Sequence, residues 1–287
     1  MNSDNNHKQR QIVDKHSKAF LSGGTFRWKR NQEEIKIDLL SKIAERRIVR
    51  TLPLKRLMAV AAAIIVAVGI TSFMRFYSTT ITVPAGLHQT AMLPDGSTVE
   101  LNAESSLTYY PFWWPIERKI TFTGEGFFQV EKGKTFQVAS SHGTTQVLGT
   151  SFNIFSRDDI YRVTCVTGKV KVANSSKDHV ILLPGNQAEI LANNEIRVST
   201  LTNVNTEISW KNNLFLFTAT PLRRVFNEIE RQYAVIIEMD VTSGDLYTGN
   251  FNRSSKIEDV LDLICPAASL KFEKKSTNVY LIRKASE

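Results

Sequence analysis

The stretch LMAVAAAIIVAVGITSFM, residues 57–74, contains 18 consecutive uncharged residues between Arg56 and Arg75. At about 1.5 Å of rise per residue, such a helix is roughly 27 Å long, close to the hydrocarbon thickness of a bilayer. A cleaved signal peptide fits poorly, because it would begin near residue 1 and have a shorter apolar core. We expect a membrane-spanning helix, with the core helix of a soluble protein as the alternative. The predicted span includes Leu57, Ala62, Ile65, Gly69 and Met74.

The net positive charge of the chain lies entirely before this apolar segment. Residues 1–56 hold 14 Lys and Arg against 6 Asp and Glu, whereas residues 57–287 hold 22 of each. Cytoplasmic flanks of membrane helices are enriched in Lys and Arg. We therefore expect a cytoplasmic head and an exterior tail. Because topology explains the basic charge, no direct nucleic-acid binding is expected.

Two short amphipathic helices are expected in the head, residues 1–56. One covers roughly residues 12–20, and the other follows Asn31, with Glu34 three residues later as in a capping box, and runs to about Arg50. Two such helices bury little apolar surface between them. The head is either a juxtamembrane stalk with a solvated basic face or a partner-binding arm. The candidate contacts of such an arm are Phe26, Trp28, Ile35, Leu39 and Ile43.

Residues 79–200 have the pattern of an all-β domain, either a sandwich or a solenoid-like fold. Turn signals recur every 8–12 residues or so, and β-rich runs such as TVELNA (98–103) and YRVTCV (161–166) lie between them. Several runs alternate apolar and polar residues, which is typical of strands with one buried face. Cys165 and Cys265 fall in different predicted domains, and we expect buried free thiols.

Six motif-like segments follow one another in this region. They are LPDGSTVELNAESSLTYY (93–110), R-x-I-x-F-x-GEGFFQV (118–130), F-x-V (136–138), VLGTSFNI (147–154), TGKVKV (167–172) and LPGNQAEI (183–190). Any one of them is a weak signal, but six in this order are a strong one. Together they resemble the periplasmic domain of FecR-type anti-sigma regulators.

The resemblance implies a single-pass protein of the inner membrane, with a cytoplasmic N-terminus, periplasmic C-terminal domains and contact with membrane lipid. The head would bind an extracytoplasmic-function sigma factor. The exterior part would receive a signal from the signalling domain of an outer-membrane TonB-dependent receptor. Relatives of this type are thought to be cut in or near the membrane. An intramembrane protease is therefore a further implied partner, and Gly69 and Thr71 are positions where the span would unwind locally.

We expect the motif residues to be structural rather than ligand-binding. Glycines in strands mark bulges or close approaches, and Leu-Pro-Asp-Gly-Ser is expected to form a hairpin turn. Phe127 and Phe155 are expected in the core, and a solvated carboxylate is expected at Glu125. The motif residues are Pro94, Asp95, Gly96, Gly124, Glu125, Phe128, Gly149, Thr150, Phe152, Gly168, Pro184 and Gly185.

An aromatic run, YYPFWW, occupies residues 109–114, with proline at 111 and 115. The prolines interrupt any strand there, and several large rings in one loop are hard to bury together. The run is a docking patch, a plug of the β core or a surface against lipid headgroups. As a docking patch it would offer the receptor Tyr109, Tyr110, Phe112, Trp113 and Trp114.

Residues 208–287 predict a small α+β domain with the order βαβ-βαββ. Leu222, Val225, Phe226 and Ile229 form one apolar helix face. Thr220 and Ser255 are expected to cap the two helices, and Pro266 to end the second. The region resembles the short N-terminal signalling module of secretins and TonB-dependent receptors, and the C-terminal region of Bacteroidetes FecR-like proteins. Recognition is expected at a sheet edge or an outer helix face.

No catalytic pattern is apparent. The five histidines lack metal-binding spacing, and the chain has no Cys-x-x-Cys, phosphate-binding glycine loop or G-x-S-x-G motif. We expect neither enzymatic activity nor a cofactor. Two alternatives to a regulator stay open. One is an envelope structural or transport-associated protein whose head is only an anchor. The other is a carbohydrate-binding or hydrolytic β-protein that uses residues 109–114.

Overall fold

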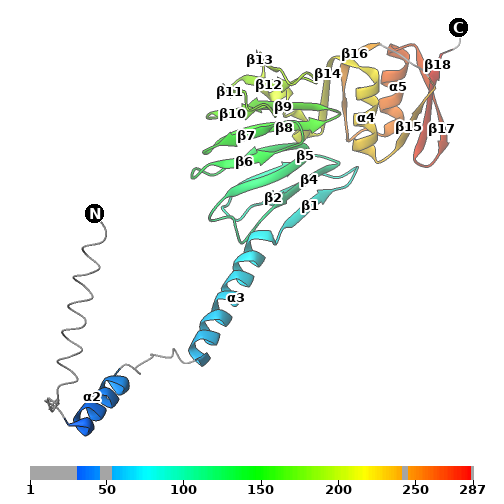
Figure 1. The fold of residues 1–287 in the computed structure, drawn as a ribbon. Helices are drawn as coiled ribbons and strands as arrows, with labels where there is room; N and C mark the ends of the chain where they lie inside the picture. Colours follow the sequence, from blue (N-terminus) through cyan, green and yellow to red (C-terminus); the bar gives the residue numbers. More distant parts are fainter. Residues whose placement is uncertain (1–30, 46–53, 241–244, 286–287) are drawn as a thin grey trace, which may run out of the picture. The chain divides into compact units, whose positions relative to one another are not determined.

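The computed structural model describes residues 31–45, 54–240 and 245–285. The chain divides into two compact units, Met1–Ile65 and Val66–Glu287, and each is described by itself. The described part of the first unit contains helix α2 (Gln32–Glu45) and the beginning of helix α3 (Leu54–Phe76) (Figure 1). The first predicted head helix, Phe26, Trp28 and the predicted end of the second head helix lie outside the described residues.

Helix α3 contains the whole predicted span, including Leu57, Ala62, Ile65, Gly69 and Met74. It is long and apolar enough to cross a membrane, and none of its residues is buried. Its 23 residues give a length of about 35 Å, slightly more than the ~30 Å hydrocarbon core of a bilayer. Within the part of the chain that the structure describes, none of these side chains is buried, which does not fit the alternative of a buried core helix.

Thirteen strands within residues 79–200, all of which are described, form a sandwich-like, nearly closed sheet. The long strand β5 (Arg118–Gln129) belongs to both halves. Residues 118–123 pair with β4 and β6, and residues 124–129 pair with β3 and β8. The other strands are β1 (Thr79–Val83), β2 (Gln89–Met92), β3 (Thr98–Leu101), β4 (Ser105–Tyr109), β6 (Phe136–Ala139), β7 (Thr144–Val147), β8 (Ser151–Arg157), β9 (Ile160–Cys165), β10 (Val170–Ala173), β11 (His179–Leu182), β12 (Asn186–Ile190) and β13 (Ile196–Thr200).

One half has the strand order β11-β10-β7-β6-β5-β4-β1, and the other has the order β13-β12-β9-β8-β5-β3-β2. All these neighbours are antiparallel except β5 and β6, which are parallel. The prediction of an all-β domain is confirmed, and of its two forms the structure has the sandwich-like one. The solenoid-like form is wrong, because the halves face each other across one core.

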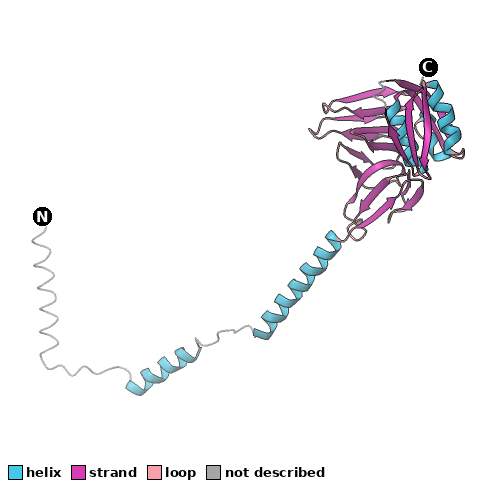
Figure 2. Cartoon of the chain, turned by 90° about the vertical axis from the view of Figure 1, so that its right-hand side faces the viewer, coloured by secondary structure: helices cyan, strands magenta, loops and turns pink. Residues whose placement is uncertain are grey.

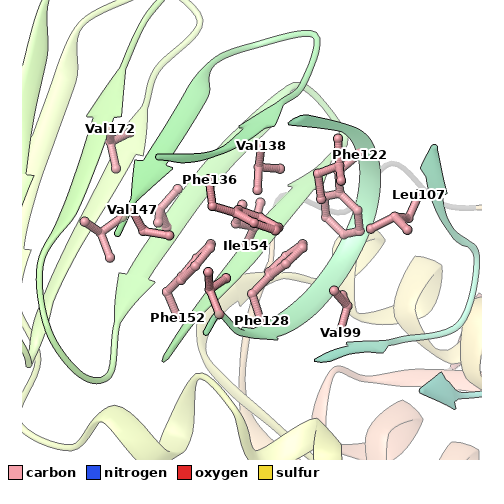
Figure 3. Close-up of a cluster of buried hydrophobic side chains, with 14 of the residues drawn as sticks. Val99, Leu107, Phe122, Phe128, Phe136, Val138, Val147, Phe152, Ile154 and Val172 are labelled. Carbon is pink, nitrogen blue, oxygen red and sulfur yellow. The ribbon is translucent and has the colours of Figure 1, made fainter. Parts of the chain in front are cut away.

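That core is rich in aromatic rings (Figure 3). Phe128 stacks on Phe152 with 5.0 Å between ring centroids, and it meets Phe122 edge-on at 5.2 Å. All three are fully buried, as is Phe136 of β6. Phe128 and Phe152 come from one half of the sheet and Phe122 from the other part of β5. The rings therefore join the two halves.

Strand β5 changes halves at Gly124, whose φ is +104°. A Cβ atom there would lie 2.4 Å from the Ser105 hydroxyl oxygen. That hydroxyl accepts a hydrogen bond from the Glu125 amide at 3.0 Å and donates one to the Glu125 carbonyl at 2.9 Å. The crossing therefore requires both positive φ and a missing side chain, which only glycine supplies.

The C-terminal module has the predicted order βαβ-βαββ. Two short 3-10 helices, η1 (Val204–Thr206) and η2 (Ser209–Asn212), lead into it. Its elements are β14 (Leu214–Pro221), α4 (Leu222–Tyr233), β15 (Ile236–Met239), β16 (Leu246–Asn252), α5 (Ile257–Ala267), β17 (Leu270–Ser276) and β18 (Val279–Lys284). β14 pairs with β16, and β15, β18 and β17 form a three-stranded sheet. Helices α4 and α5 are the cyan elements beside the strands in Figure 2.

The predicted helix caps differ from the observed ones. Pro221 is the N-cap of α4, because Thr220 is still paired in β14 opposite Tyr247. Lys256, not Ser255, is the N-cap of α5. Pro266 lies inside the last turn and does not end the helix, since its carbonyl accepts a hydrogen bond from Ser269.

We predict that Gly124→Ala destabilises the protein more than Gly185→Ala. Gly185 also has positive φ, +89°, but no atom lies within 4 Å of its virtual Cβ. Alanine at 185 therefore costs about 1–2 kcal/mol of backbone strain, while the collision with Ser105 adds about 1–3 kcal/mol at 124. Urea unfolding of the full chain in detergent measures both losses. Equal losses would show that the crossing tolerates a side chain.

Candidate functional site

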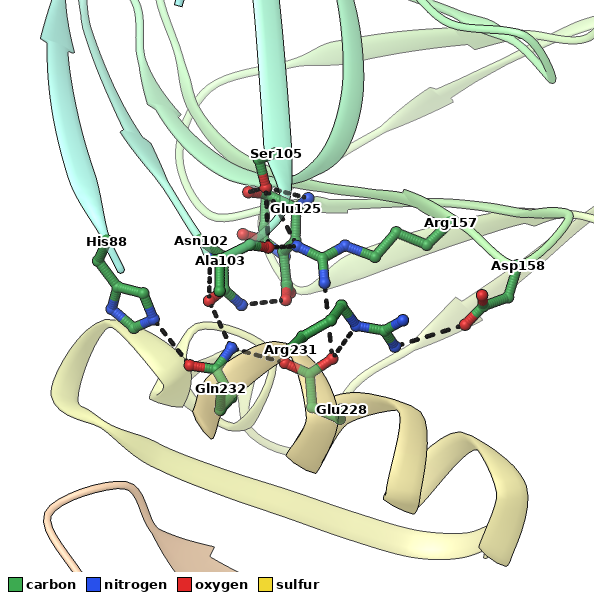
Figure 4. Close-up of polar contacts among 11 residues, drawn as sticks. His88, Asn102, Ala103, Ser105, Glu125, Arg157, Asp158, Glu228, Arg231 and Gln232 are labelled. Carbon is green, nitrogen blue, oxygen red and sulfur yellow. Dashed lines mark hydrogen bonds and ion pairs between the residues drawn. The ribbon is translucent and has the colours of Figure 1, made fainter. Parts of the chain in front are cut away.

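A buried polar network joins the β domain to the C-terminal module (Figure 4). Helix α4 contributes Glu228, Arg231 and Gln232, whose i, i+3 and i+4 spacing puts them on one face. Their exposed fractions are 7%, 8% and 2%. The other face of α4 carries the predicted apolar residues, which are buried in the module: Leu222, Val225, Phe226 and Ile229. Helix α4 is thus buried on two sides.

Glu228 is surrounded by cations and hydrogen-bond donors. Arg231 Nε donates to one carboxylate oxygen at 3.0 Å, and Gln232 Nε2 donates to the other at 2.8 Å. Arg157, from the end of β8, forms an ion pair with Glu228 at 3.7 Å, and Arg231 also pairs with Asp158 at 3.4 Å. Burial opposes ionisation of Glu228, but Arg157 and Arg231 outweigh it and lower its pKa. Glu228 is therefore a buried anion held by two arginines.

Glu125, on β5, is a second buried carboxyl group beside the first. Asn102 and Asn153 donate their side-chain amides to its two oxygens at 2.8 and 3.1 Å. Burial, reinforced by the negative charge of Glu228, raises the pKa of Glu125 to about 7. The expectation of a solvated carboxylate here is wrong, because the C-terminal module covers this part of β5.

Gln232 connects the network to two residues that flank β strands, His88 before β2 and Asn102 after β3. Its amide nitrogen also donates to Asn102 Oδ1 at 2.8 Å, and its oxygen lies 3.0 Å from His88 Nε2. The His88 ring meets Trp210 edge-on at 5.6 Å. Burial lowers the pKa of His88, so the neutral ring is favoured. One glutamine side chain of α4 therefore links groups that lie 130 and 144 residues earlier in the chain.

Apolar side chains also pack between the β domain and the C-terminal module, beside the polar network. Phe127 belongs to the buried cluster of the C-terminal module, together with Trp210 and Phe251. Lys211 Nζ lies 3.8 Å from the centroid of the Phe127 ring, and Trp210 Nε1 donates to Asn153 at 3.3 Å. Phe127 is buried as predicted, but in the core of the module, because neighbouring residues of a strand point to opposite faces.

A cleft of about 280 Å³ opens beside the network. Its walls come from both domains and include Phe155, Arg162, Trp210 and Phe217. Phe155 was expected in the core, but it is only half-buried and lines this cleft, with the Arg157 and Arg162 guanidinium groups 5.9 Å from its ring centroid. Strand β14 also lines the cleft and, among the described strands, pairs only with β16.

Most of the motif residues lie in turns and in the core. Asp95 accepts hydrogen bonds from the Ser97 amide and hydroxyl at 3.1 and 2.9 Å and pairs with Arg118. Arg118 also donates to the carbonyls of Glu131 and Lys134 at 2.9 and 2.8 Å, so the first turn is tied to β5. Phe128 and Phe152 are core residues, as described above. The remaining motif positions lie at turns or strand ends: Pro94, Gly96, Gly149, Thr150, Gly168, Pro184 and Gly185.

The aromatic run is divided between two environments. Trp114 is buried, and its ring meets Tyr109 and Phe136 edge-on at 5.8 and 5.7 Å. Trp114 therefore plugs the β core, which was one of the three alternatives. Tyr110, Phe112 and Trp113 instead contact the end of α3.

In the first unit, three candidate contact residues lie on α2. Ile35, Leu39 and Ile43 are 37%, 55% and 54% exposed. The Asn31 amide donates to the Glu34 carboxylate at 3.4 Å, as the capping-box prediction requires.

The sequence reasoning missed Arg157, Glu228, Arg231 and Gln232. Charged residues on an amphipathic helix usually face water, and no local pattern shows that a distant domain covers them.

Cys165 and Cys265 are free and buried. Within residues 31–45, 54–240 and 245–285, no three His, Cys, Asp or Glu residues gather as metal ligands.

Comparisons with known proteins find similarity along both the β domain and the C-terminal module. Residues 79–171 match the family model "FecR protein", and residues 214–281 match "FecR, C-terminal". Two crystal structures of a putative anti-sigma factor from Parabacteroides distasonis ATCC 8503 are 28% identical to the chain. They superimpose with TM-scores of 0.67 and 0.66, covering 73% and 72% of this chain and 100% of the other. No curated protein matches the chain.

We predict that Glu125 makes stability fall as the pH rises from about 4.5 to about 7. In this range the folded state keeps a proton that the unfolded state has lost, because the pKa of Glu125 is raised to about 7. Fewer protons bound in the unfolded state mean a negative slope of unfolding free energy with pH. Glu125→Gln removes this component and leaves the titrations of His88 and Glu228 in place.

Urea unfolding of the full chain across this pH range measures the difference between variant and wild type. The matched control is Glu117→Gln at an exposed carboxylate, which should keep the wild-type profile. A Glu125→Gln profile parallel to that of the wild type would contradict the assignment.

Proposed function

The chain belongs to the FecR family, and from this premise we propose that it is a single-pass inner-membrane anti-sigma factor. It binds an extracytoplasmic-function sigma factor with its head and responds to an outer-membrane TonB-dependent receptor with its exterior domains. The observation that carries the proposal is the order of the parts: a basic head, a helix apolar enough to span a membrane, and the two family domains.

The charge distribution supports this orientation. All excess positive charge precedes residue 57, where the uncharged stretch of α3 begins, as expected for a cytoplasmic flank. A head in the cytoplasm and a tail in the periplasm put the sigma factor and the receptor on opposite sides of one helix. The same topology places α3 within reach of an intramembrane protease, for which Gly69 is a candidate point of unwinding.

The apolar side chains of α2 support a protein partner for the head. Ile35, Leu39 and Ile43 share one side of a 14-residue helix and are 37–55% exposed. A helix of this length is marginal on its own in water. Docking this face into a groove of a sigma factor would cover it and stabilise the helix.

The cleft and β14 supply a docking position for the exterior partner. A free strand edge accepts a strand from another protein, with main-chain hydrogen bonds giving affinity and side-chain pockets giving specificity. Leu216, which is 39% exposed, and Phe217 of β14 line the cleft. We assign this edge to the signalling domain of the receptor.

Through the polar network, binding of the receptor to the C-terminal module would affect the β domain. A partner bound at β14 sits beside α4, whose Glu228 and Arg231 contact Arg157 and Asp158 of the β domain. Displacing α4 would leave buried charges without partners, so the two domains respond together.

An anchor role for the head is the competing proposal, in which the exterior domains serve an envelope assembly. In this competing proposal the head binds no sigma factor, whereas in the anti-sigma proposal it does. The carbohydrate-binding alternative is less well supported, because Trp114 is buried and the neighbouring rings contact α3.

We predict that residues 1–56, expressed alone, bind an extracytoplasmic-function sigma factor of the source bacterium. Leu39→Asp should weaken binding at least about tenfold, since burying a leucine contributes roughly 1.5–3 kcal/mol. Ile37→Asp is the matched control, because Ile37 is 66% exposed and lies on the other side of α2. Isothermal titration calorimetry gives the affinities. A head that binds no sigma factor would favour the anchor alternative.

We also predict that Leu216→Lys weakens binding of the receptor's signalling domain to the full chain in detergent. Lysine at this position places a charge in the cleft beside β14. Leu263→Lys, on the exposed side of α5 and 57% exposed in the wild type, should bind normally. If only Leu263→Lys weakens binding, the receptor docks on the outer helix face and the β14 assignment is wrong.

A further inference from the structure

Aromatic rings and one cation form a cluster where α3 meets the β domain, within the second unit. Phe112 lies 5.9 Å from Phe73 and 5.3 Å from Tyr77, measured between ring centroids. The guanidinium carbon of Arg75 lies 5.7 Å from the Tyr110 ring and 5.2 Å from the Trp113 ring. We call these residues the aromatic collar: Phe73, Arg75, Tyr77, Tyr110, Phe112 and Trp113.

The collar leaves much of its apolar surface uncovered. Phe73 is 58% exposed, and Tyr77 and Phe112 are each 46% exposed. Next to them in the chain, Phe76 is 72% and Ile116 62% exposed. The neighbouring Trp114, by contrast, is 4% exposed. Within this loop, Trp114 is therefore buried in the β core, whereas Tyr110, Phe112 and Trp113 lie around the end of α3.

The chain leaves no room between this surface and a membrane. Helix α3 ends at Phe76 and β1 begins at Thr79, so only Tyr77 and Ser78 separate them. Two residues span at most about 7 Å. With the uncharged stretch 57–74 in the hydrocarbon, Phe73 lies at its outer edge and the other collar residues fall at the depth of the headgroups.

The chemistry of the collar fits that depth. Aromatic rings with an apolar body and a polar edge gather at membrane–water interfaces. Arg75 lies among the rings, and Lys134 Nζ donates to the Pro115 carbonyl at 3.0 Å, which places a second cation at the same loop. Arg75 and Lys134 are cations of the kind that bind the phosphate groups of lipids.

We propose that the aromatic collar is a lipid-binding surface that seats the β domain on the outer face of the membrane. The collar holds the end of α3 and the phospholipid headgroups at once, so the domain cannot swing freely about the helix. This inference rests on the membrane location in the proposed function, but not on a sigma factor or a receptor.

The test uses the full chain with Trp28→Phe, reconstituted in vesicles of phosphatidylethanolamine and phosphatidylglycerol that contain phosphatidylcholine brominated high on the acyl chain. Bromine quenches tryptophans that lie at the interface. Adding Trp113→Phe should remove most of the lipid-quenchable emission. The matched control Trp210→Phe removes a tryptophan that is buried at the domain junction, so the quenched share should rise.

Vesicle flotation separates the possible failures. A chain that floats with the vesicles, but whose quenching does not change with Trp113→Phe, overturns the collar proposal and leaves the proposed function intact. A chain that does not float overturns the membrane location and this proposal with it. If Trp113→Phe misfolds, Phe112→Trp in the Trp28→Phe background gives the same information. Its added emission must be quenched by the brominated lipid, and emission quenched only by aqueous iodide overturns the proposal.

Discussion

The structure of the β domain and the C-terminal module depends on the burial of the Glu228 carboxylate between Arg157 and Arg231. A buried charge is costly unless it is paired and hydrogen-bonded. Glu228 belongs to the C-terminal module, where Arg231 of the same helix pairs with it, and Arg157 of the β domain supplies the second cation. The same contact also places Gln232 against Asn102 and His88. One face of helix α4 therefore contacts Arg157, Asn102 and His88 of the β domain.

This constraint gives a physical route for a signal. A partner that binds at β14 or α4 and displaces Glu228 would leave buried charges only partly paired. Such a half-satisfied buried network is unfavourable. The β domain in turn reaches the end of α3 through Tyr110, Phe112 and Trp113. Contacts among the described residues thus connect the C-terminal module to the end of helix α3 through the β domain. The Glu125 carboxyl, with a pKa of about 7, adds a proton-dependent component to the same junction.

Much of the fold could be predicted from the sequence. The apolar stretch 57–74 gave the long helix, the alternating runs gave the β domain, and the spacing of Leu222, Val225 and Phe226 gave α4. These features depend on periodicity along one segment, which a sequence displays directly. Cap positions were less predictable, since Thr220 remained in its strand through pairing with β16.

The candidate site was largely beyond prediction for the same physical reason. Glu125 looks like a solvated strand residue and Glu228 like a solvated helix residue, and only their distant pairing buries them both. The exposure of the rings in residues 109–114 likewise depends on tertiary contacts, which bury Trp114 and leave Phe112 at the surface. Long-range contacts of this kind leave no local pattern.

We expect the β domain and the C-terminal module to unfold as one cooperative body. Native-state hydrogen exchange of the full chain in detergent measures it most directly, through the opening free energies of amides in α4 and β5. We expect equal opening free energies for the most protected amides of both elements. A separate opening of α4 and α5 at much lower free energy, with β5 still protected, would contradict it.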